Sequence, residues 1–205
     1  MSRAGQAVES LMPLARAGHA DALGQLLERY RNYLELLARL EIGRRLQSKF
    51  DAADIVQETF LDAHATFAEF RGSTERELVA WLRQVLAYNL ASLVRHYCGT
   101  QRRNVGLERE LAADLDASSQ ALDPGFMATT SSPSQQAARR EQAVLLADAL
   151  GRLSADYREV IILRQLQGLT FPEVARQMNR SVESVKKLWV RGLARLRGAL
   201  GLVEG

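Results

Sequence analysis

The chain has 205 residues, of which 47% are hydrophobic and 25% are charged, values typical of a globular protein with one or two domains. Its single cysteine, Cys98, excludes an intrachain disulfide and suggests a reducing compartment. Arg16 and His19 interrupt the N-terminal segment, so it does not resemble a signal peptide. No apolar run approaches the roughly 18 residues that span a bilayer. We therefore expect a cytoplasmic protein without membrane insertion.

The net charge of +3 is small, but the charges are unevenly distributed along the chain. Between residues 170 and 205 there are seven Lys or Arg residues and three Glu residues. Between residues 108 and 124 there are five acidic residues and one Arg. A basic C-terminal segment after an acidic one indicates a charged binding partner.

Hydrophobic periodicity predicts an all-α fold, because apolar residues recur at steps of three and four and rarely alternate. Residues 1–97 form a first helical block, and residues 141–205 form another. The intervening residues 98–140 are acidic at first and then rich in Ser, Thr, Pro and Gly. We expect two small helical domains joined by a flexible, partly acidic linker.

The segment from Asp54 to Phe67 is predicted to be an amphipathic helix. Val56, Phe60 and Ala63 begin an apolar stripe at three- and four-residue steps that continues to Phe67. The rest of the helix carries Asp54, Gln57, Glu58, Leu61 and Asp62. From periodicity alone, the favoured interpretation of that face is a solvated acidic surface.

The next segment is a loop, Arg71–Thr74, followed by a helix that contains Trp81. Small polar residues on an exposed loop can contact unstacked bases, and nearby arginine and aromatic groups hold single strands. Trp81 lies at helical spacing from Leu78, Val85 and Tyr88, so we expect it in the core.

In the last block, a first helix is predicted to start after Ser154 and to end near Gly168, a residue suited to a helix C-terminus. Its inward residues are expected to be Tyr157, Val160, Ile161 and Leu163. A second helix begins at Thr170, where Glu173 completes a capping box. Pro172 lies in its first turn, where the missing N–H costs nothing.

A third helix is predicted to begin at Ser181, another N-cap residue, after a short turn at Met178–Arg180. One side carries the apolar residues Val185, Leu188, Trp189, Leu193, Leu196 and Leu200, and the other carries Glu183, Ser184, Lys187 and Arg191. Two capped helices with so short a connection predict a helix-turn-helix that places its second helix in the major groove of DNA. The alternative is a helical hairpin with a solvated charged face. Val190 lies off the apolar side, which favours contact with a groove or partner.

These residues resemble region 4 of bacterial sigma-70 family factors over LSADYREVIILRQLQGLTFPEVARQMNRSVESVKKLWVRGLARLR. In the first block, FDAADIVQETFLDAHATFAEFRG resembles region 2.2, and STERELVAWLRQVLAYNLASLVRHY resembles regions 2.3 to 2.4. The order, with no room for regions 1.1 or 3, resembles the extracytoplasmic-function (ECF) group. The FRGSTE and KLWVR motifs most resemble a subtype common in planctomycetes.

The resemblance implies an alternative sigma factor that binds core RNA polymerase and directs it to promoters for transcription initiation. It implies a region 2 domain at residues 1–97, a region 4 domain at 141–205 and a linker at 98–140. The implied partners are the clamp helices of the β′ subunit, the β flap, promoter DNA and an anti-sigma factor.

The resemblance also implies three sets of binding residues. The set for core polymerase is Asp54, Gln57, Glu58, Leu61 and Asp62. The set for the −10 element is Arg71, Gly72, Ser73, Thr74, Arg83, Asn89 and Arg95. The set for the −35 element is Thr170, Arg180, Ser181, Glu183, Ser184, Lys186, Lys187 and Arg191. Leu188 and Trp189 replace the commonest family residues, Arg and Leu, which puts one DNA contact in doubt.

The sequence is compatible with two interpretations of the linker. Its acidic part, residues 108–123, is either a disordered tether or a strand that occupies a positively charged channel of polymerase.

Two other classes of protein compete with the sigma-factor interpretation. A conventional helix-turn-helix regulator would not need the first-block motifs and would bind its operator without polymerase. An enzyme is not expected, because there is no phosphate-binding glycine loop and no Cys/His metal spacing, and the three histidines are far apart. We therefore expect no catalytic residues, no metal and no cofactor.

Overall fold

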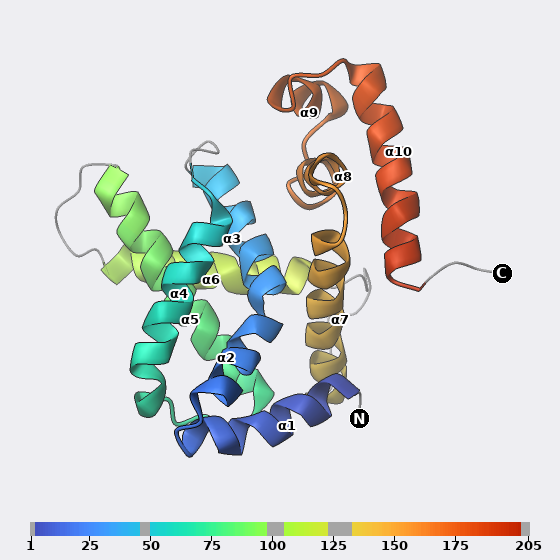
Figure 1. Ribbon diagram of the computed structural model, residues 1–205. Coiled ribbons are helices and arrows are strands. Elements are labelled where there is room, and N and C mark those ends of the chain that lie inside the picture. Colours follow the sequence, from blue (N-terminus) through green and yellow to red (C-terminus); the bar gives the residue numbers. More distant parts are fainter. Residues whose placement is uncertain (1–2, 46–49, 98–104, 123–132, 202–205) are drawn as a thin grey trace.

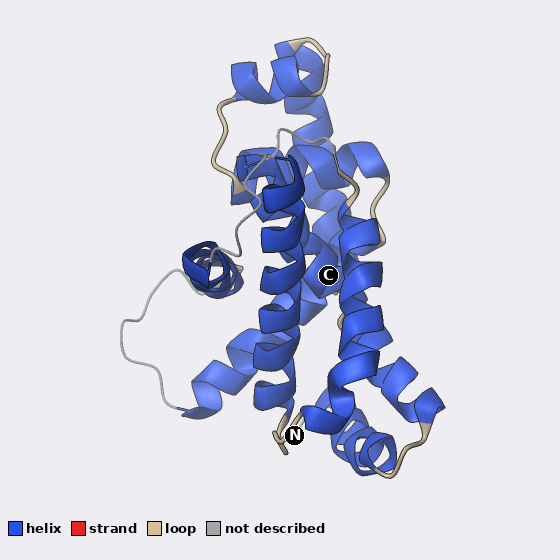
Figure 2. Ribbon diagram, turned by 90° about the vertical axis from the view of Figure 1, so that its left-hand side faces the viewer, coloured by secondary structure: helices blue, strands red, loops and turns tan. Residues whose placement is uncertain are grey.

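A computed structural model describes residues 3–45, 50–97, 105–122 and 133–201 of the chain (Figure 1). Over these residues the secondary structure is helical, without strands (Figure 2), which confirms the predicted all-α class. The helices are α1 (Arg3–Arg16), α2 (Ala20–Arg29), α3 (Arg31–Arg45), α4 (Ala52–Thr66), α5 (Glu75–Tyr97), α6 (Val105–Ala121), α7 (Pro133–Gly151), α8 (Ala155–Ile161), α9 (Phe171–Gln177) and α10 (Val182–Ala199). A 3-10 turn (Phe67–Glu69) follows α4, and a π-helical turn (Ile162–Leu166) follows α8.

Helix α3 is the centre of the structure. It packs against α4, α5, α6 and α7, and Figure 1 shows it running between α4 and α7. Its residues Tyr33, Leu34 and Leu37 are at most 1% exposed, as is Tyr30 just before it. Because α3 is apolar around most of its circumference, it needs neighbours on several sides to keep that surface from water.

Helix α6 lies inside the stretch that the sequence analysis expects to be a flexible linker. It packs against α3, α5 and α7, and its residues Leu111, Leu115 and Leu122 are at most 2% exposed. These leucines recur at helical spacing and bury one side of an otherwise acidic segment. The structure therefore differs from the prediction at residues 105–122, whereas residues 98–104 and 123–132 lie outside the described residues. Helix α7 also begins at Pro133, ahead of the domain boundary expected at residue 141.

The second half of the chain packs on the first through α7. The Asn32 side-chain amide of α3 donates to Asp148 of α7 at 2.8 Å. Beyond α7, the Arg158 guanidinium donates to the backbone carbonyls of Leu150, Gly151 and Leu153 at 2.8 to 3.1 Å. Leu150 and Gly151 are the last residues of α7 and Leu153 lies in the turn after it, so Arg158 both caps α7 and fixes the start of α8.

Replacing Leu115 with alanine tests whether α6 is part of the core. We expect Leu115→Ala to lower the free energy of unfolding by about 2–5 kcal/mol, because it leaves a cavity at a fully buried site. Urea unfolding followed by circular dichroism measures this change, with exposed Gln120→Ala on the same helix as control. A change below about 0.5 kcal/mol, as surface substitutions give, would show that α6 is a detached tether.

Candidate polymerase and DNA interfaces

The polar face of α4 lies exposed, opposite a buried apolar stripe. Asp51 caps the helix by accepting from the Ala53 N–H at 3.0 Å. Val56, Phe60 and Ala63 are at most 8% exposed, as the apolar stripe predicts. Asp54, Gln57, Glu58 and Leu61 are exposed and Asp62 is half-buried. None of these five side chains makes a hydrogen bond or ion pair with the described residues. The helix is therefore anchored by its apolar side and presents its polar side to solvent.

The loop Arg71–Thr74 is held by Glu77 at the start of α5. The Glu77 carboxylate accepts from the Ser73 N–H at 2.8 Å, and from the Thr74 N–H and hydroxyl at 3.0 and 2.8 Å. The hydrogen bond from the Ser73 backbone is the main reason that the pKa of Glu77 lies below its ordinary value, and the Thr74 hydroxyl adds to it. Ser73 and Thr74 are thus exposed but fixed in place.

Gly72 is closely surrounded within this loop. A Cβ at Gly72 would overlap the Phe70 ring and the Glu77 Cβ, so no larger residue fits without movement. The Arg16 guanidinium of α1 donates to the Gly72 carbonyl. The loop is therefore attached to α1 as well as to α5.

An aromatic cluster lies beneath the loop. Trp81 packs against Phe67 and Phe70, with ring centroids 6.0 and 5.1 Å away. Trp81 is half-buried and packs against the core, as the sequence analysis predicts. Tyr88, two turns along α5, is 45% exposed, so the apolar stripe of α5 turns toward solvent there.

The other residues predicted to contact the −10 element have partners within the chain. Arg83 donates to Asp116 at 2.7 Å and to the Tyr33 hydroxyl at 3.2 Å. Arg95 pairs with Glu108 at 3.2 Å, and Asn89 donates to the Thr59 hydroxyl at 3.4 Å. The structure therefore separates this set into an exposed loop, Arg71–Thr74, and two covered arginines. Sequence reasoning missed Asp116 and Glu108 as their partners.

The caps predicted for the helix-turn-helix are present. The π-helical turn that continues α8 ends at Leu166, shortly before Gly168, whose φ of +73° is one that glycine adopts readily. The N–H and hydroxyl of Thr170 donate to Glu173 at 2.7 and 2.6 Å. The Ser181 hydroxyl accepts from the Ser184 N–H at 3.2 Å and caps α10. Glu173 accordingly has a pKa below its ordinary value, first because of the Thr170 hydroxyl.

A glycine lets the helices of this unit approach each other closely. A Cβ at Gly192 of α10 would lie 3.3 Å from the Ile161 side chain of α8. The turn before α10 also contains Asn179 with a φ of +50°, a conformation that asparagine tolerates better than most residues. Figure 1 shows α10 at the edge of the molecule, beyond α8 and α9.

The exposed face of α10 is mainly basic. Lys187 and Arg191 are exposed and make no ion pair with the described residues, while Lys186 lies 3.6 Å from Glu183. Arg180, in the preceding turn, pairs with Asp156 at 2.7 Å. Val190 lies on the same face and is 60% exposed.

The unusual residues Leu188 and Trp189 belong to the inner side of α10. Both are half-buried and pack against the hydrophobic core. The Trp189 ring meets Phe171 of α9 edge-on, with centroids 5.6 Å apart. Trp189 therefore connects α10 to α9, and neither residue interrupts the basic face.

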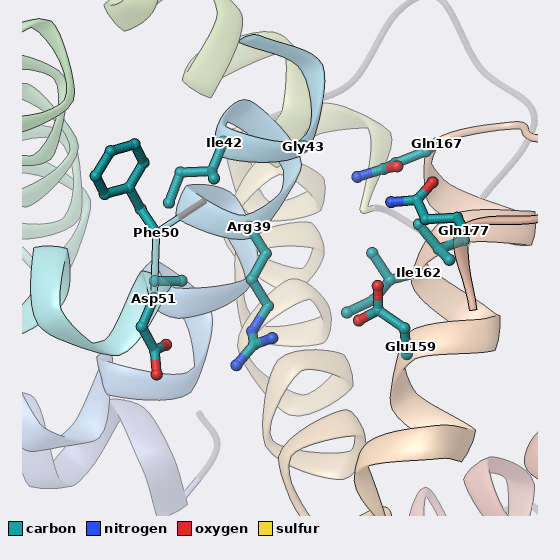
Figure 3. Close-up of a pocket in the computed structure, with 11 residues that line it drawn as sticks. Arg39, Ile42, Gly43, Phe50, Asp51, Glu159, Ile162, Gln167 and Gln177 are labelled. Atoms are coloured by element: carbon teal, nitrogen blue, oxygen red, sulfur yellow. The ribbon is translucent and has the colours of Figure 1, made fainter. Parts of the chain in front are cut away.

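A cavity that the sequence did not predict lies between the two halves of the chain. Its volume is about 380 Å³, and it is lined by the end of α3, the start of α4, and parts of α8, the π-helical turn and α9. Arg39 extends toward it from one side and Glu159 from the other (Figure 3). Its lining residues are scattered along the sequence, so no local motif marks them.

Within the described ranges, no three His, Cys, Asp or Glu side chains gather where they could hold a metal ion. The same ranges contain no helix long and apolar enough to cross a membrane.

Comparison with known proteins identifies the family. Residues 143–196 match the model described as Sigma-70, region 4. The chain is 30% identical over 186 residues to the RNA polymerase sigma factor CnrH of Cupriavidus metallidurans, which covers 91% of this chain and 90% of the relative. The chain belongs to the sigma-70 family of RNA polymerase sigma factors. As a sigma factor, it directs RNA polymerase to promoters for transcription initiation.

A second relative indicates the group within the sigma-70 family. The ECF RNA polymerase sigma-E factor of Haemophilus influenzae is 28% identical over 179 residues, which are 87% of each chain. The sigma factor is thus of the ECF group. A solved structure of CnrH with the cytosolic domain of CnrY aligns with 97% of this chain and 99% of that one, at 26% identity and a TM-score of 0.34.

The low pKa of Glu77 predicts an acid-dependent contribution to stability. A carboxylate with a lowered folded-state pKa stabilises above its unfolded pKa of about 4.3, and this contribution is lost as the pH falls through the folded value. We expect Glu77→Gln to lower the thermal midpoint at pH 7 and to have a smaller effect below about pH 4. Glu69→Gln, at an exposed site without such hydrogen bonds, is the control. An equal effect of Glu77→Gln at both pH values would contradict the assignment.

Proposed function

We propose that this sigma factor contacts polymerase and promoter through three separate surfaces. In this proposal residues 1–97 act as region 2, residues 98–140 as the linker and residues 141–205 as region 4. The observation that carries it is the basic face of α10, which is exposed at the edge of a capped helix-turn-helix.

We place core polymerase on the α4 face, formed by Asp54, Gln57, Glu58, Leu61 and Asp62. Leu61 is 56% exposed and lies one turn after Gln57 and Glu58 on the helix surface. An exposed apolar residue with a polar rim suits a protein interface, and acidic groups suit a basic partner surface. The partner at this face is the pair of β′ clamp helices, while region 4 contacts the β flap.

We place the −10 element on α5 and the loop before it. The exposed side chains of Arg71, Ser73 and Thr74 would contact unstacked bases, beside the close turn at Gly72. The hydrogen bonds to Glu77 support this role, because a loop that is already ordered loses less entropy when it binds. Arg83, Asn89 and Arg95 would contact the strand further along α5.

We place the −35 element on α10 and the turn before it. The residues of this surface are Thr170, Arg180, Ser181, Glu183, Ser184, Lys186, Lys187 and Arg191. Lysine and arginine contact phosphates and guanine edges, and Glu183 can accept from a cytosine amino group. The inward packing of Leu188 and Trp189 supports the proposal, because neither residue takes a DNA-contacting position.

Three further properties belong to the same proposal. An anti-sigma factor is a further partner in this proposal, and the cavity beside Arg39 and Glu159 is its site between the two halves. The FRGSTE and KLWVR motifs support the subtype common in planctomycetes. The chain acts without catalysis of its own, in the cytoplasm, where polymerase and promoters are.

Run-off transcription with purified core polymerase and a genomic promoter library tests the proposal. We expect specific initiation that requires this chain. A conventional helix-turn-helix regulator would instead bind DNA without associating with core polymerase, and that result would overturn the proposal.

Removing two carboxylates from the α4 face should weaken the binding of core polymerase. We expect Asp54→Ala/Glu58→Ala to raise the dissociation constant about tenfold or more, because charge pairs in an interface contribute at least about 1.4 kcal/mol together. Biolayer interferometry measures the constant. The control, Glu9→Ala/Glu69→Ala, removes the same charge from exposed positions outside the α4 face. Equal affinities for the two double variants would place the polymerase elsewhere.

Removing two basic residues from α10 should weaken use of the −35 element. We expect Lys187→Ala/Arg191→Ala to reduce run-off transcription at least tenfold, since each good base contact is worth about 1–3 kcal/mol. Arg197→Ala, another exposed basic residue of α10, should stay within twofold of wild type. The assignment fails if the double variant and the control transcribe equally well.

A further inference from the structure

Helix α6 covers the two arginines that we assign to the −10 strand. Asp116 holds Arg83 and Glu108 holds Arg95, and both arginine side chains are only 15% exposed. The paired residues follow opposite orders along the two helices. Asp116, nearer the C-terminus of α6, meets Arg83, nearer the N-terminus of α5. A single acidic helix therefore occupies two basic positions along α5.

We propose that α6 is an internal substitute for the promoter strand. Its carboxylates occupy Arg83 and Arg95 in the free chain, and this part of the −10 surface opens only when α6 leaves. The inference rests on the proposed role of the two arginines. Carboxylate and phosphate oxygens form the same charge-assisted hydrogen bonds with guanidinium, so one can replace the other.

The contacts of α6 link its position to that of Arg83. Tyr33 of α3 shares a hydrogen bond of 2.7 Å with Ser119 of α6 and also accepts from Arg83. Arg83 therefore joins α6 both directly, through Asp116, and indirectly, through Tyr33. Movement of α6 away from α3 and α5 breaks the Arg83–Asp116 and Tyr33–Ser119 contacts together, and Arg83 then keeps only its hydrogen bond to Tyr33.

The buried surface of α6 includes polar groups as well as leucines. The Ser118 hydroxyl donates to Glu41 at 3.1 Å, and these side chains are 2% and 1% exposed. A polar contact in the interior stabilises less than an apolar one of the same size, because both groups lose water when they are buried. Helix α6 is thus held firmly enough to fold on α3 and α5. Part of its buried surface is polar, however, so its removal costs less than that of a wholly apolar helix.

The same structure leaves the other proposed surfaces open. Asp54 and Glu58 on α4 are exposed, as are Lys187 and Arg191 on α10. Core polymerase can therefore dock on α4 while α6 still covers Arg83 and Arg95. This arrangement favours an order in which polymerase binds first and the −10 strand is captured afterwards.

The alternative is that α6 is a permanent part of region 2 and that its ion pairs are structural only. The test measures binding of the free, full-length chain to a fluorescein-labelled single-stranded oligonucleotide. Its sequence is the non-template −10 strand of a promoter obtained by run-off selection. Fluorescence anisotropy measures the affinity of wild type and of Glu108→Gln/Asp116→Asn. The control, Glu9→Gln/Asp21→Asn, changes the net charge equally at exposed sites away from α6.

We expect Glu108→Gln/Asp116→Asn to bind the oligonucleotide about tenfold more tightly than the control. Because two arginines gain phosphate contacts, the slope of log affinity against log salt should steepen by about 1.4. Adding Arg83→Gln and Arg95→Gln should abolish the gain. If the double variant does not fold, as circular dichroism would show, Asp116→Asn alone should still give a smaller gain that requires Arg83.

Two outcomes would overturn the inference: equal affinity of the double variant and the control, or a gain that persists without the arginines. Promoter opening by holoenzyme, followed by permanganate reactivity, tests the proposed function separately. Suppose that Arg83→Gln/Arg95→Gln impairs promoter opening, while Glu108→Gln/Asp116→Asn leaves the affinity of the free chain for the oligonucleotide unchanged. In that case only the inference about α6 fails. If holoenzyme carrying Arg83→Gln/Arg95→Gln opens promoters normally, the assignment of these arginines to the −10 strand fails as well.

Discussion

The burial of α3 is the constraint on which the rest of the structure depends. Leu34, Leu36 and Ile42 point in different directions around this helix, and all are at most 4% exposed. A helix that is apolar around most of its surface must be covered on several sides. In this chain α4, α5, α6 and α7 provide that cover, so the acidic segment and the second half of the chain both pack on the first half.

This constraint decides which functional side chains are exposed. Helix α4 turns its apolar stripe toward α3 and thereby presents Asp54, Glu58 and Leu61 outward. Helix α6, which covers α3 from another side, brings Asp116 and Glu108 to the arginines of α5. When α6 packs on the core at α3, it therefore also covers the proposed DNA surface at Arg83 and Arg95. Such a link between a packed helix and a binding surface is what a two-state conformational change requires.

Local features were predictable from the sequence where short-range chemistry determines them. The capping box of Thr170 and Glu173 and the cap at Ser181 depend on residues three positions apart, and both are present. The stripe of Val56 and Phe60 was equally predictable, because helical periodicity alone places such residues on one side. Family motifs then supplied the order of the regions.

Long-range contacts were not predictable in this way. Leu111 and Leu115 lie among acidic and small residues beside a segment rich in Ser, Thr, Pro and Gly, and composition there favours a linker. Their burial depends on α3 and α5, far away in sequence. The same holds for the Arg83–Asp116 pair, since a partner 33 positions away leaves no local pattern. For Leu188 and Trp189, the inward orientation became clear only from the contact of Trp189 with Phe171.

The most direct test of the central claim, that α6 covers α5 in the free chain and leaves it in the promoter complex, is amide hydrogen exchange along α6. The measurement compares the free chain, the holoenzyme and the open promoter complex, and reads protection at residues 107–121. We expect protection in the free chain, because α6 is helical and packed there, and loss of that protection in the open complex. Equal protection of α6 in the free chain and the open complex would contradict the claim.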